Sequence, residues 1–146
     1  APRGKVDVAL AIPDDLATIQ GDPHQLRQLF TNLLINAFEA MNGRGSVRIE
    51  ATELPEEEAP TGGEALVGAR VQVDVTDSGP GVPPDVMDRI FSPFFTTKPQ
   101  GTGLGLAIVR KIVNAHDGRI DVQVPSAGGT QFRVTLPVSS EHELFR

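Results

Sequence analysis

The chain has 146 residues, which predicts one domain that is large enough to bury a hydrophobic core without staples. Hydrophobic residues make up 39% of it and charged residues 22%, as in soluble globular proteins, and the lack of cysteine excludes a disulfide framework and a thiolate metal site. The net charge of −6 argues against nucleic-acid binding, and no apolar stretch is long enough to span a membrane.

The first part of the chain predicts two strands on either side of one long helix. Apolar residues alternate over residues 6–12, as in a strand. Asp22 is a good N-cap and Pro23 suits the first helical position, so a helix begins here, and its apolar periodicity continues to about Met41. A second strand is predicted over residues 46–52.

One side of this helix carries a polar stripe, because Gln28, Asn32, Asn36 and Glu39 recur at helical spacing. Such stripes are usually solvated, but a solvated face normally carries Lys, Glu and Arg, and asparagine is a poor helix former. Amide carbonyl oxygens among apolar neighbours suit a hard cation such as Mg²⁺. The stripe therefore indicates either a solvated face or a metal-binding one.

A third strand is predicted over residues 71–76, and it is followed by a loop that runs from Asp77 to Gly81. Taken alone, the loop favours an ordinary turn, since Asp-Ser-Gly and Pro-Gly are common in turns. In a binding site, Asp77 would accept a hydrogen bond from a ligand amine. Gly79 and Gly81 would let the backbone approach the ligand where a Cβ would collide.

The remaining segments complete a small domain. We expect an acidic surface loop over residues 53–69 and an aromatic core plug over residues 91–95, which hold three of the seven phenylalanines. None of the three histidines has a partner in the sequence that would make it catalytic. Gly118 suits a left-handed helix terminus. Further helices and strands are predicted over residues 86–90, 107–115, 120–124 and 130–136, followed by a frayed tail at 138–146.

A glycine-rich segment precedes the predicted helix at 107–115. Its residues are Gly101, Thr102, Gly103, Leu104 and Gly105. Free backbone N–H groups at the positive end of a helix are suited to binding phosphate. No strand comes directly before the glycines, which argues against a Rossmann dinucleotide site. Lys98 adds a cation close by in the sequence, either as a phosphate ligand or as a solvated side chain.

These motifs, in this order, resemble the ATP-binding catalytic domain of sensor histidine kinases, in particular the nitrogen-regulation type. The wider superfamily includes gyrase, Hsp90 and MutL. The matching segments are an N box at 32–37, an F box at 91–98, and glycine boxes at 77–81, 101–106 and 128–130. The resemblance covers about residues 5–137 of the single domain at 1–146. It implies an α+β two-layer sandwich, the Bergerat fold, with a mixed, mostly antiparallel sheet, three helices and a flexible ATP lid.

The resemblance also implies a role for each motif at the base of the nucleotide. Asp77 would accept a hydrogen bond from the adenine N6 amine, which selects adenine because guanine presents an acceptor at that position. Thr130 would support this contact, directly or through water. Gly79 and Gly81 would bring the backbone close to the base.

At the phosphates, the resemblance implies that Asn36 ligates Mg²⁺ and that Asn32 lies beside the metal or the γ-phosphate as the catalytic residue. Lys98 and the lid segment from Gly101 to Gly105 would hold phosphate oxygens. Two positions depart from the family pattern: Glu39 stands where many members carry a phosphate-binding Lys, and Ala40 where many carry an aromatic that stacks on adenine. We therefore expect a modest affinity for ATP.

A kinase of this family transfers the γ-phosphoryl group to a histidine on a helical dimerization domain, which this sequence does not contain. The resemblance implies that the acceptor lies upstream in a longer, homodimeric parent protein that serves a response regulator. For the fragment we expect a monomer in the cytoplasm with no membrane contact, whether or not the parent is anchored to the inner membrane. Two alternatives remain open: a serine kinase of the anti-sigma type, and a non-catalytic nucleotide-binding docking module. A gyrase-like ATPase is disfavoured, since it usually carries a Glu where Asn32 stands.

Overall fold

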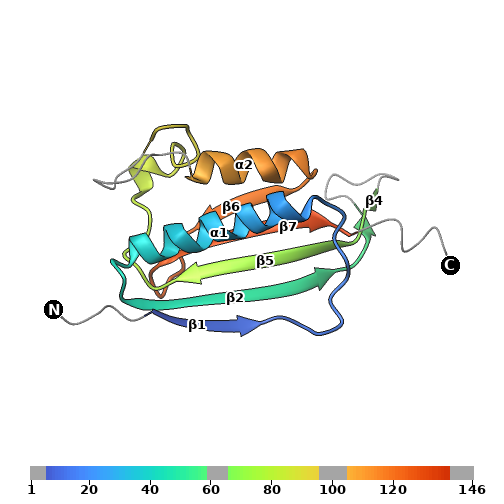
Figure 1. Cartoon of the computed structure of the whole chain (residues 1–146), viewed down its shortest axis with the longest axis horizontal. Coiled ribbons are helices and arrows are strands. Elements are labelled where there is room, and N and C mark those ends of the chain that lie inside the picture. Colours follow the sequence, from blue (N-terminus) through green and yellow to red (C-terminus); the bar gives the residue numbers. More distant parts are fainter. Residues whose placement is uncertain (1–5, 59–65, 96–104, 139–146) are drawn as a thin grey trace.

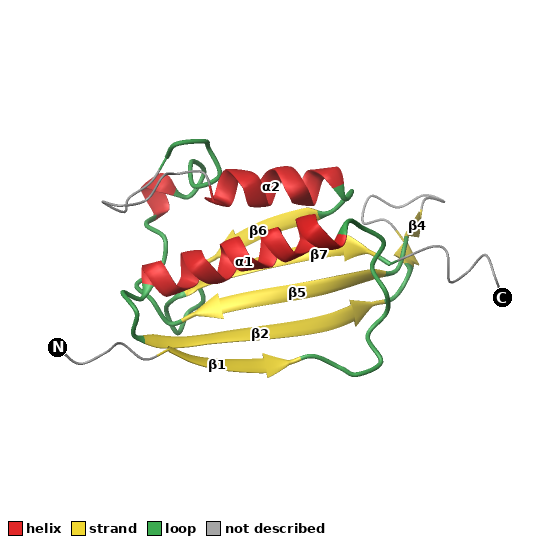
Figure 2. Ribbon diagram, in the orientation of Figure 1, coloured by secondary structure: helices red, strands yellow, loops and turns green. Residues whose placement is uncertain are grey.

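The computed structural model describes residues 6–58, 66–95 and 105–138, and these form two layers (Figures 1 and 2). One layer is a five-stranded sheet with the strand order β1-β2-β5-β7-β6. The other layer consists of the helices α1 and α2, which lie across one face of the sheet. The main elements are β1 (Val6–Ala11), α1 (Pro23–Ala40), β2 (Gly45–Leu54), β5 (Arg70–Asp77), α2 (Gly105–Ala115), β6 (Arg119–Gln123) and β7 (Thr130–Pro137).

The direction of the strands confirms the predicted mixed sheet. β1 pairs with β2 in parallel, and the long helix α1 connects them. The pairs β2–β5, β5–β7 and β6–β7 are all antiparallel. The crossover through α1 follows from the parallel pair, because parallel neighbours need a connection that is far longer than a hairpin turn. The sheet is therefore mostly antiparallel, with one parallel edge strand.

The beginning of α1 matches the sequence prediction. Asp22 is the N-cap, and its Oδ1 accepts hydrogen bonds from the backbone N–H of His24 at 2.8 Å and of Gln25 at 3.4 Å. Pro23 occupies the first helical position, where a backbone N–H would have no acceptor within the helix, so its absence in proline costs no hydrogen bond. At the other end, Gly43 N donates to Phe38 O at 3.2 Å, and Asn42 adopts a left-handed φ of 53°.

The hydrophobic core lies between the helices and the sheet. Leu29, Leu33 and Ala37 of α1 are at most 2% exposed, and Val109 and Val113 of α2 are fully buried. The opposing sheet residues are those that alternate inward along the strands: Val47, Val71, Val73, Val75, Phe132, Val134 and Leu136. This alternation is expected of a sheet with one face covered by helices and the other face open to water.

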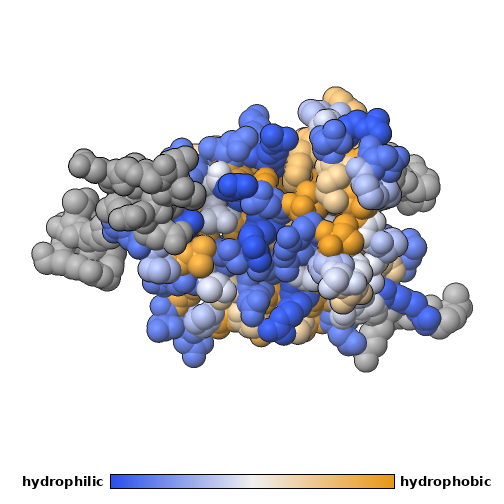
Figure 3. Space-filling view, turned by 180° about the vertical axis from the view of Figure 1, so that it is seen from behind, coloured by the Kyte–Doolittle hydropathy of each residue, from blue (hydrophilic) through white to orange (hydrophobic). Residues whose placement is uncertain are grey.

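The other face of the sheet is largely hydrophilic where Figure 3 shows it. Arg133 of β7 reaches across to Asp74 of β5 with two hydrogen bonds, of 2.9 and 3.2 Å. Arg48 pairs with Glu50 at 3.4 Å on β2. These side chains pair with one another across and along the strands, as expected of a sheet face that has no second apolar layer upon it.

Three local predictions need correction. The helix predicted at 86–90 is instead a short 3₁₀ helix, η1 (Pro84–Val86), followed by turns, so the described residues hold two α-helices and one 3₁₀ helix. Bonds of the i+3 type, such as Arg89 N to Val86 O at 2.9 Å, continue through these turns in place of the i+4 bonds of an α-helix.

The second correction concerns the loop predicted at 53–69. Strand β2 extends into it as far as Leu54, and the two-residue strands β3 (Glu57–Glu58) and β4 (Leu66–Val67) form a small separate hairpin. The third concerns Gly118, which does not have a left-handed φ, whereas Asp117 before it does, at 56°. Gly118 is needed for a different reason: a Cβ there would lie 2.6 Å from the Thr135 carbonyl oxygen.

The predicted aromatic plug is only partly in the core. Phe91 packs edge-to-face on the buried Phe132, with the ring centroids 6.2 Å apart, and Phe95 also packs against the core. Phe94, in contrast, is 75% exposed. No helix in the described part of the chain is long and apolar enough to cross a membrane.

Candidate functional site

Asp77 places a buried carboxylate at the end of the central strand β5. Asp77 is only 4% exposed and lies on the face of the sheet that the helices cover. Asp77 pairs with Val47 of β2 on one side and with Thr130 of β7 on the other, and Thr130 is also 4% exposed. Asp77 Oδ1 accepts a hydrogen bond from Gly79 N at 2.8 Å. The predicted pair Asp77 and Thr130 is thus brought together by strand register.

Three glycines lie in the turns next to Asp77, at positions where a side chain would not fit. A Cβ on Gly129, whose φ is +84°, would lie 2.0 Å from the Asp77 carbonyl oxygen. A Cβ on Gly79 would lie 3.0 Å from Asp77 Oδ1 and 3.2 Å from the Ala40 carbonyl oxygen. Gly81 has a φ of +86° and faces the Gly129 carbonyl oxygen. The glycines at 79 and 81 therefore have a reason within the protein, in addition to the approach of a ligand predicted for them.

The polar stripe of α1 is solvated at its two ends, where Gln28 and Glu39 are exposed, but not in its middle. Asn32 and Asn36 are half-buried. Asn32 directly precedes the buried Leu33, and Asn36 directly precedes the buried Ala37. Asn32 Nδ2 is buried and has no hydrogen-bond partner among the described residues. A buried donor without an acceptor costs about 1–3 kcal/mol, so such a group in a folded protein calls for an explanation. An anionic oxygen from a ligand would satisfy it.

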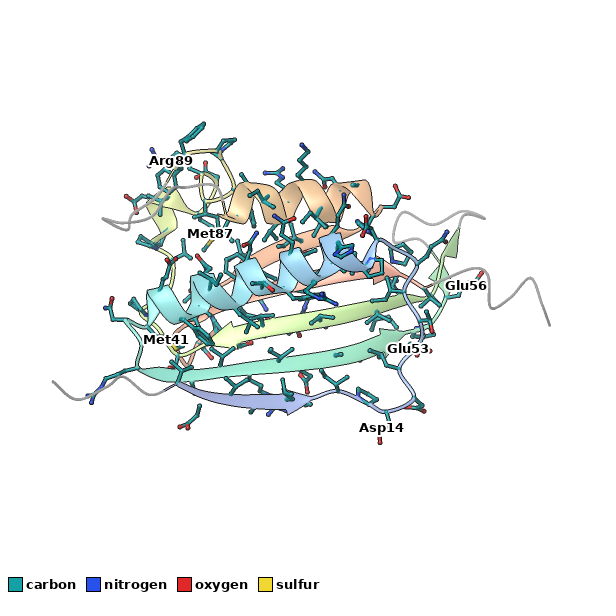
Figure 4. All side chains as sticks on the ribbon, viewed as in Figure 1. Asp14, Met41, Glu53, Glu56, Met87 and Arg89 are labelled. Carbon is teal, nitrogen blue, oxygen red and sulfur yellow. The ribbon has the colours of Figure 1, made fainter. Side chains whose placement is uncertain are left out.

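Asn36 lies toward the same end of the molecule as Asp77, whereas Asn32 lies in the middle of α1, about one turn further from that end. The loop after β5 touches the end of α1, because Gly79 abuts the Ala40 carbonyl and Ser78 Oγ lies 3.4 Å from Met41 Sδ. Asn36 precedes Ala40 by four residues, or about 6 Å along the helix axis. Figure 4 shows Met41 at this end, on the same side of the molecule as Met87 and Arg89.

The first turn of α2 lies above the middle of α1 (Figure 1). Gly105, predicted as part of a glycine-rich loop, is the first residue of α2, so the helix begins two residues earlier than expected. Lys98, Gly101, Thr102, Gly103 and Leu104 lie outside the described residues.

The acidic side chains of Asp14, Glu53 and Glu56 are gathered at the opposite end of the molecule (Figure 4). A phosphate-bearing ligand at the Asn36 end would therefore be remote from these three negative charges, whose Coulomb repulsion falls with distance and with screening by salt. The described residues contain no group of three or more His, Asp or Glu that would form a metal cage. A cation here would depend on amide oxygens and on oxygens of the ligand, which is how proteins commonly hold Mg²⁺ with phosphates.

An open apolar groove lies beside the candidate site. It has a volume of about 450 Å³ and runs between the turn at Phe91 and Pro93 and the outer face of α2, where Ala107 and Ile108 line it. Arg110 stacks over the Phe91 ring at 5.7 Å, and Arg89 stacks over Phe95 at 5.3 Å.

Phe94, which follows the groove residue Pro93, is unusual in two respects: its side chain is exposed, and its φ is +67°. A bulky residue in that conformation is uncommon. Sequence reasoning missed this exposure because a cluster of aromatics next to a proline favours burial.

The structure also gives His116 a structural role, as expected of a residue without a catalytic partner. Its Nε2 accepts a hydrogen bond from Asp22 N at 3.1 Å, and its Nδ1 lies 2.8 Å from the Ile112 carbonyl oxygen. The ring thus joins the start of α1 to the end of α2. A Cβ on Gly21 would lie 2.5 Å from the His116 ring, so glycine is needed there.

Comparison with known proteins connects this geometry to a family. The family described as "Histidine kinase-, DNA gyrase B-, and HSP90-like ATPase" matches residues 21–140. The sensor histidine kinase ZraS of Escherichia coli strain K12 is 39% identical over 135 residues, which is 92% of this chain and 26% of ZraS. The sensory histidine kinase/phosphatase NtrB of Rhodobacter capsulatus is 44% identical over 122 residues, which is 82% of this chain and 33% of NtrB.

A solved structure agrees with the fold. The catalytic domain of histidine kinase ThkA superposes with a TM-score of 0.73 and 34% sequence identity, and the match covers 93% of this chain and 81% of that one. The chain spans about a quarter to a third of the length of the two curated relatives.

Proposed function

We propose that this chain, which belongs to the family of histidine kinase-, DNA gyrase B- and HSP90-like ATPases, binds Mg·ATP. It then supplies the γ-phosphoryl group to a histidine on a dimerization domain of a longer sensor kinase. The sensor histidine kinases among its relatives support this reading over a serine kinase or a docking module. The similarity to NtrB agrees with the predicted nitrogen-regulation type. The observation that carries the proposal is the buried carboxylate of Asp77 near the end of α1, the helix that carries Asn36 and the unpaired amide of Asn32.

At the base end, Asp77 accepts a hydrogen bond from the adenine N6 amine. The carboxylate is buried, so its discrimination between an amine and a carbonyl is stronger than it would be in water. Thr130, its partner across β7, is positioned to support the contact with its hydroxyl. Guanine would present a carbonyl oxygen to the carboxylate, and two acceptors that face each other repel.

At the phosphate end, Asn32 donates to a phosphate oxygen and Asn36 ligates Mg²⁺ through its amide oxygen. The buried Nδ2 of Asn32 supports the first assignment, because this group is a donor in need of an acceptor. Bound Mg²⁺ supplies charge neutralisation at the phosphates. The first backbone N–H groups of α2, beginning at Gly105, offer further donors at a helix N-terminus. We also propose that Lys98 and residues Gly101, Thr102, Gly103 and Leu104 contact the phosphates.

The partner of this domain is the dimerization domain that carries the acceptor histidine, followed by a response regulator. The apolar groove between Phe91 and α2 supports such docking, since a groove lined by Pro93 and Ile108 offers apolar anchoring. Phe94 adds an exposed aromatic beside it, a residue type that is enriched at protein interfaces. Location in the cytoplasm and a monomeric state for this fragment remain part of the proposal.

Isothermal calorimetry tests the nucleotide assignments, because the chain contains no Trp or Tyr for intrinsic fluorescence. Asp77→Asn is expected to weaken ATP binding by about tenfold or more, as for the loss of one charged hydrogen bond. Asn36→Ala is expected to abolish the dependence of binding on Mg²⁺. Unchanged ATP affinity in Asp77→Asn would refute the adenine assignment, and an intact Mg²⁺ dependence in Asn36→Ala would refute the metal assignment.

Phosphotransfer needs its own assay. The domain is mixed with radiolabelled ATP and a separately produced dimerization domain of the parent protein, and labelled histidine is measured over time. Label is expected on the acceptor only when both domains and Mg²⁺ are present. A domain that binds ATP tightly and never labels the acceptor would favour the docking-module alternative.

A further inference from the structure

Ser78, the second residue of the loop after β5, makes contacts that its motif position does not explain. Its backbone N–H donates to Ser46 O at 3.0 Å, one residue beyond the last β2–β5 pair, Val47 with Asp77. The return bond comes from Ser46 N, and it goes to the Ser78 hydroxyl at 2.9 Å. In a regular antiparallel pair this return bond would go to a backbone carbonyl. The Ser78 side chain therefore completes a rung of the sheet while the main chain turns away.

The same hydroxyl also contacts the end of α1. Ser78 Oγ lies 3.4 Å from Met41 Sδ, within reach for the hydroxyl to donate to sulfur. Met41 is the C-cap residue of α1 and is 7% exposed. One side chain thus joins three elements: the start of β2, the loop that follows Asp77, and the helix that carries Asn36.

The structure leaves room for this hydroxyl by placing a glycine opposite it. A Cβ on Gly45 would lie 2.5 Å from Ser78 Oγ and 2.6 Å from Met41 Sδ. Gly45 also has a φ of +146°, which side-chain-bearing residues rarely adopt. The first residue of β2 is therefore shaped around the contact between Ser78 and Met41.

We infer that Ser78 is a positioning residue for base recognition: its hydroxyl fixes the Asp77 carboxylate relative to α1, and so sets the preference for adenine over guanine nucleotides. The inference rests on the proposed function. Asp77 is one residue before Ser78, and the Gly79 N–H that bonds to its carboxylate is one residue after, so a shift of Ser78 moves both. A displaced carboxylate loses alignment with the adenine amine and also loses its repulsion of the guanine carbonyl.

The test is calorimetric titration of the domain with Mg·ATP and with Mg·GTP, for wild type and Ser78→Ala. ATP affinity is expected to fall about fivefold, within the range for one lost hydrogen bond, and the ratio of ATP to GTP affinity is expected to fall with it. Ser78→Thr keeps the hydroxyl and is expected to keep the wild-type ratio. Gly45→Ala crowds the hydroxyl from the other side and is expected to lower the ratio as Ser78→Ala does.

The ratio separates positioning from a merely structural role. A loss of folded protein would lower both affinities by the same factor and leave the ratio unchanged, and that result would overturn the inference. Failure of Ser78→Thr to restore the ratio would overturn it as well. Thr52→Ala removes an exposed hydroxyl at the far end of β2 and should alter neither affinity. Asp77→Asn reports separately on the proposed function: if it loses selectivity while Ser78→Ala keeps it, the adenine site stands and only the role of Ser78 is wrong.

Discussion

The base end and the phosphate end of the proposed site are built differently. At the base end, protein groups hold one another: Asp77 Oδ1 bonds to Gly79 N, and Ser78 Oγ bonds to Ser46 N. At the phosphate end, Asn32 Nδ2 is buried without an acceptor among the described residues. The contrast indicates that the base end is formed before ligand arrives, whereas the phosphate end keeps a donor whose partner is the ligand itself.

The largest effect is expected from breaking the base end at Gly129. In Gly129→Ala the new Cβ meets the Asp77 carbonyl oxygen, which lies 2.0 Å from its ideal position, and the residue must also keep a φ of +84°. Overpacking and backbone strain together should lower the free energy of unfolding by about 4 kcal/mol. Urea denaturation followed by far-ultraviolet circular dichroism measures this loss.

The neighbouring glycine provides a matched control. Gly128 has a similar φ of +96°, but a Cβ there has nothing within 4 Å. Gly128→Ala should therefore show the strain alone, a loss of about 1–2 kcal/mol. Equal losses in the two variants would mean that the close approach of Gly129 to the Asp77 carbonyl oxygen does not affect stability, and the description of the base end as preformed would then fail.

The phosphate end should respond in the opposite sense. Asn32→Leu replaces the orphaned amide by an apolar group of similar size, so the domain without ligand should become more stable by about 1 kcal/mol. ATP affinity should fall by about tenfold or more, because the proposed donor to phosphate is gone. Thermal unfolding without ATP and calorimetry with ATP measure the two quantities on the same protein.

Gln25→Leu serves as the comparison variant on the same helix. Gln25 is exposed, so its amide has water as a partner, and the substitution should bring no comparable gain in stability and no loss of ATP affinity. If Asn32→Leu were destabilised by several kcal/mol, the Asn32 amide would be part of the folded network, and the contrast between the two ends would be wrong.

Much of this architecture could be predicted from local sequence signals. Asp22 and Pro23 mark the start of α1 because capping is a short-range interaction, and it is observed as predicted. Alternation predicted every strand of the main sheet, and each predicted end lies within two residues of the observed one. Asp77 and Thr130, distant in sequence, were paired only through family resemblance, and the register of β5 and β7 now provides the physical reason.

The features that the sequence did not predict depend on contacts between distant segments. Nothing local distinguishes Gly118, whose role depends on the Thr135 carbonyl, from a glycine chosen for a left-handed φ. The turns after η1 were expected to be helical because Pro83, Pro84 and Asp85 suit the start of a helix, and the same residues also suit the first turn of a 3₁₀ helix. Whether the Asn32 amide has a hydrogen-bond partner depends on what surrounds it in three dimensions. The spacing of the stripe alone could therefore not distinguish a solvated face from a binding one.

The smallest effect is expected on the uncovered face of the sheet, opposite the helices. Arg133 lies beside Asp74, with Nε to Oδ1 at 2.9 Å, and the hydrogen bond raises the pKa of Arg133 above its usual value. Because the pKa of Arg133 is raised, the stabilisation of the folded domain by this pair is complete below the usual arginine pKa and is lost only at still higher pH. Arg133→Gln should therefore lower the free energy of unfolding by about 1 kcal/mol, a modest amount because the arginine is partly exposed to solvent, and this loss should be constant from about pH 6 to 9.

Urea denaturation across this range measures the difference from wild type, while ATP affinity should stay unchanged. A shift in ATP affinity would show that the open face communicates with the site, and the effects at the two ends could then no longer be interpreted as local.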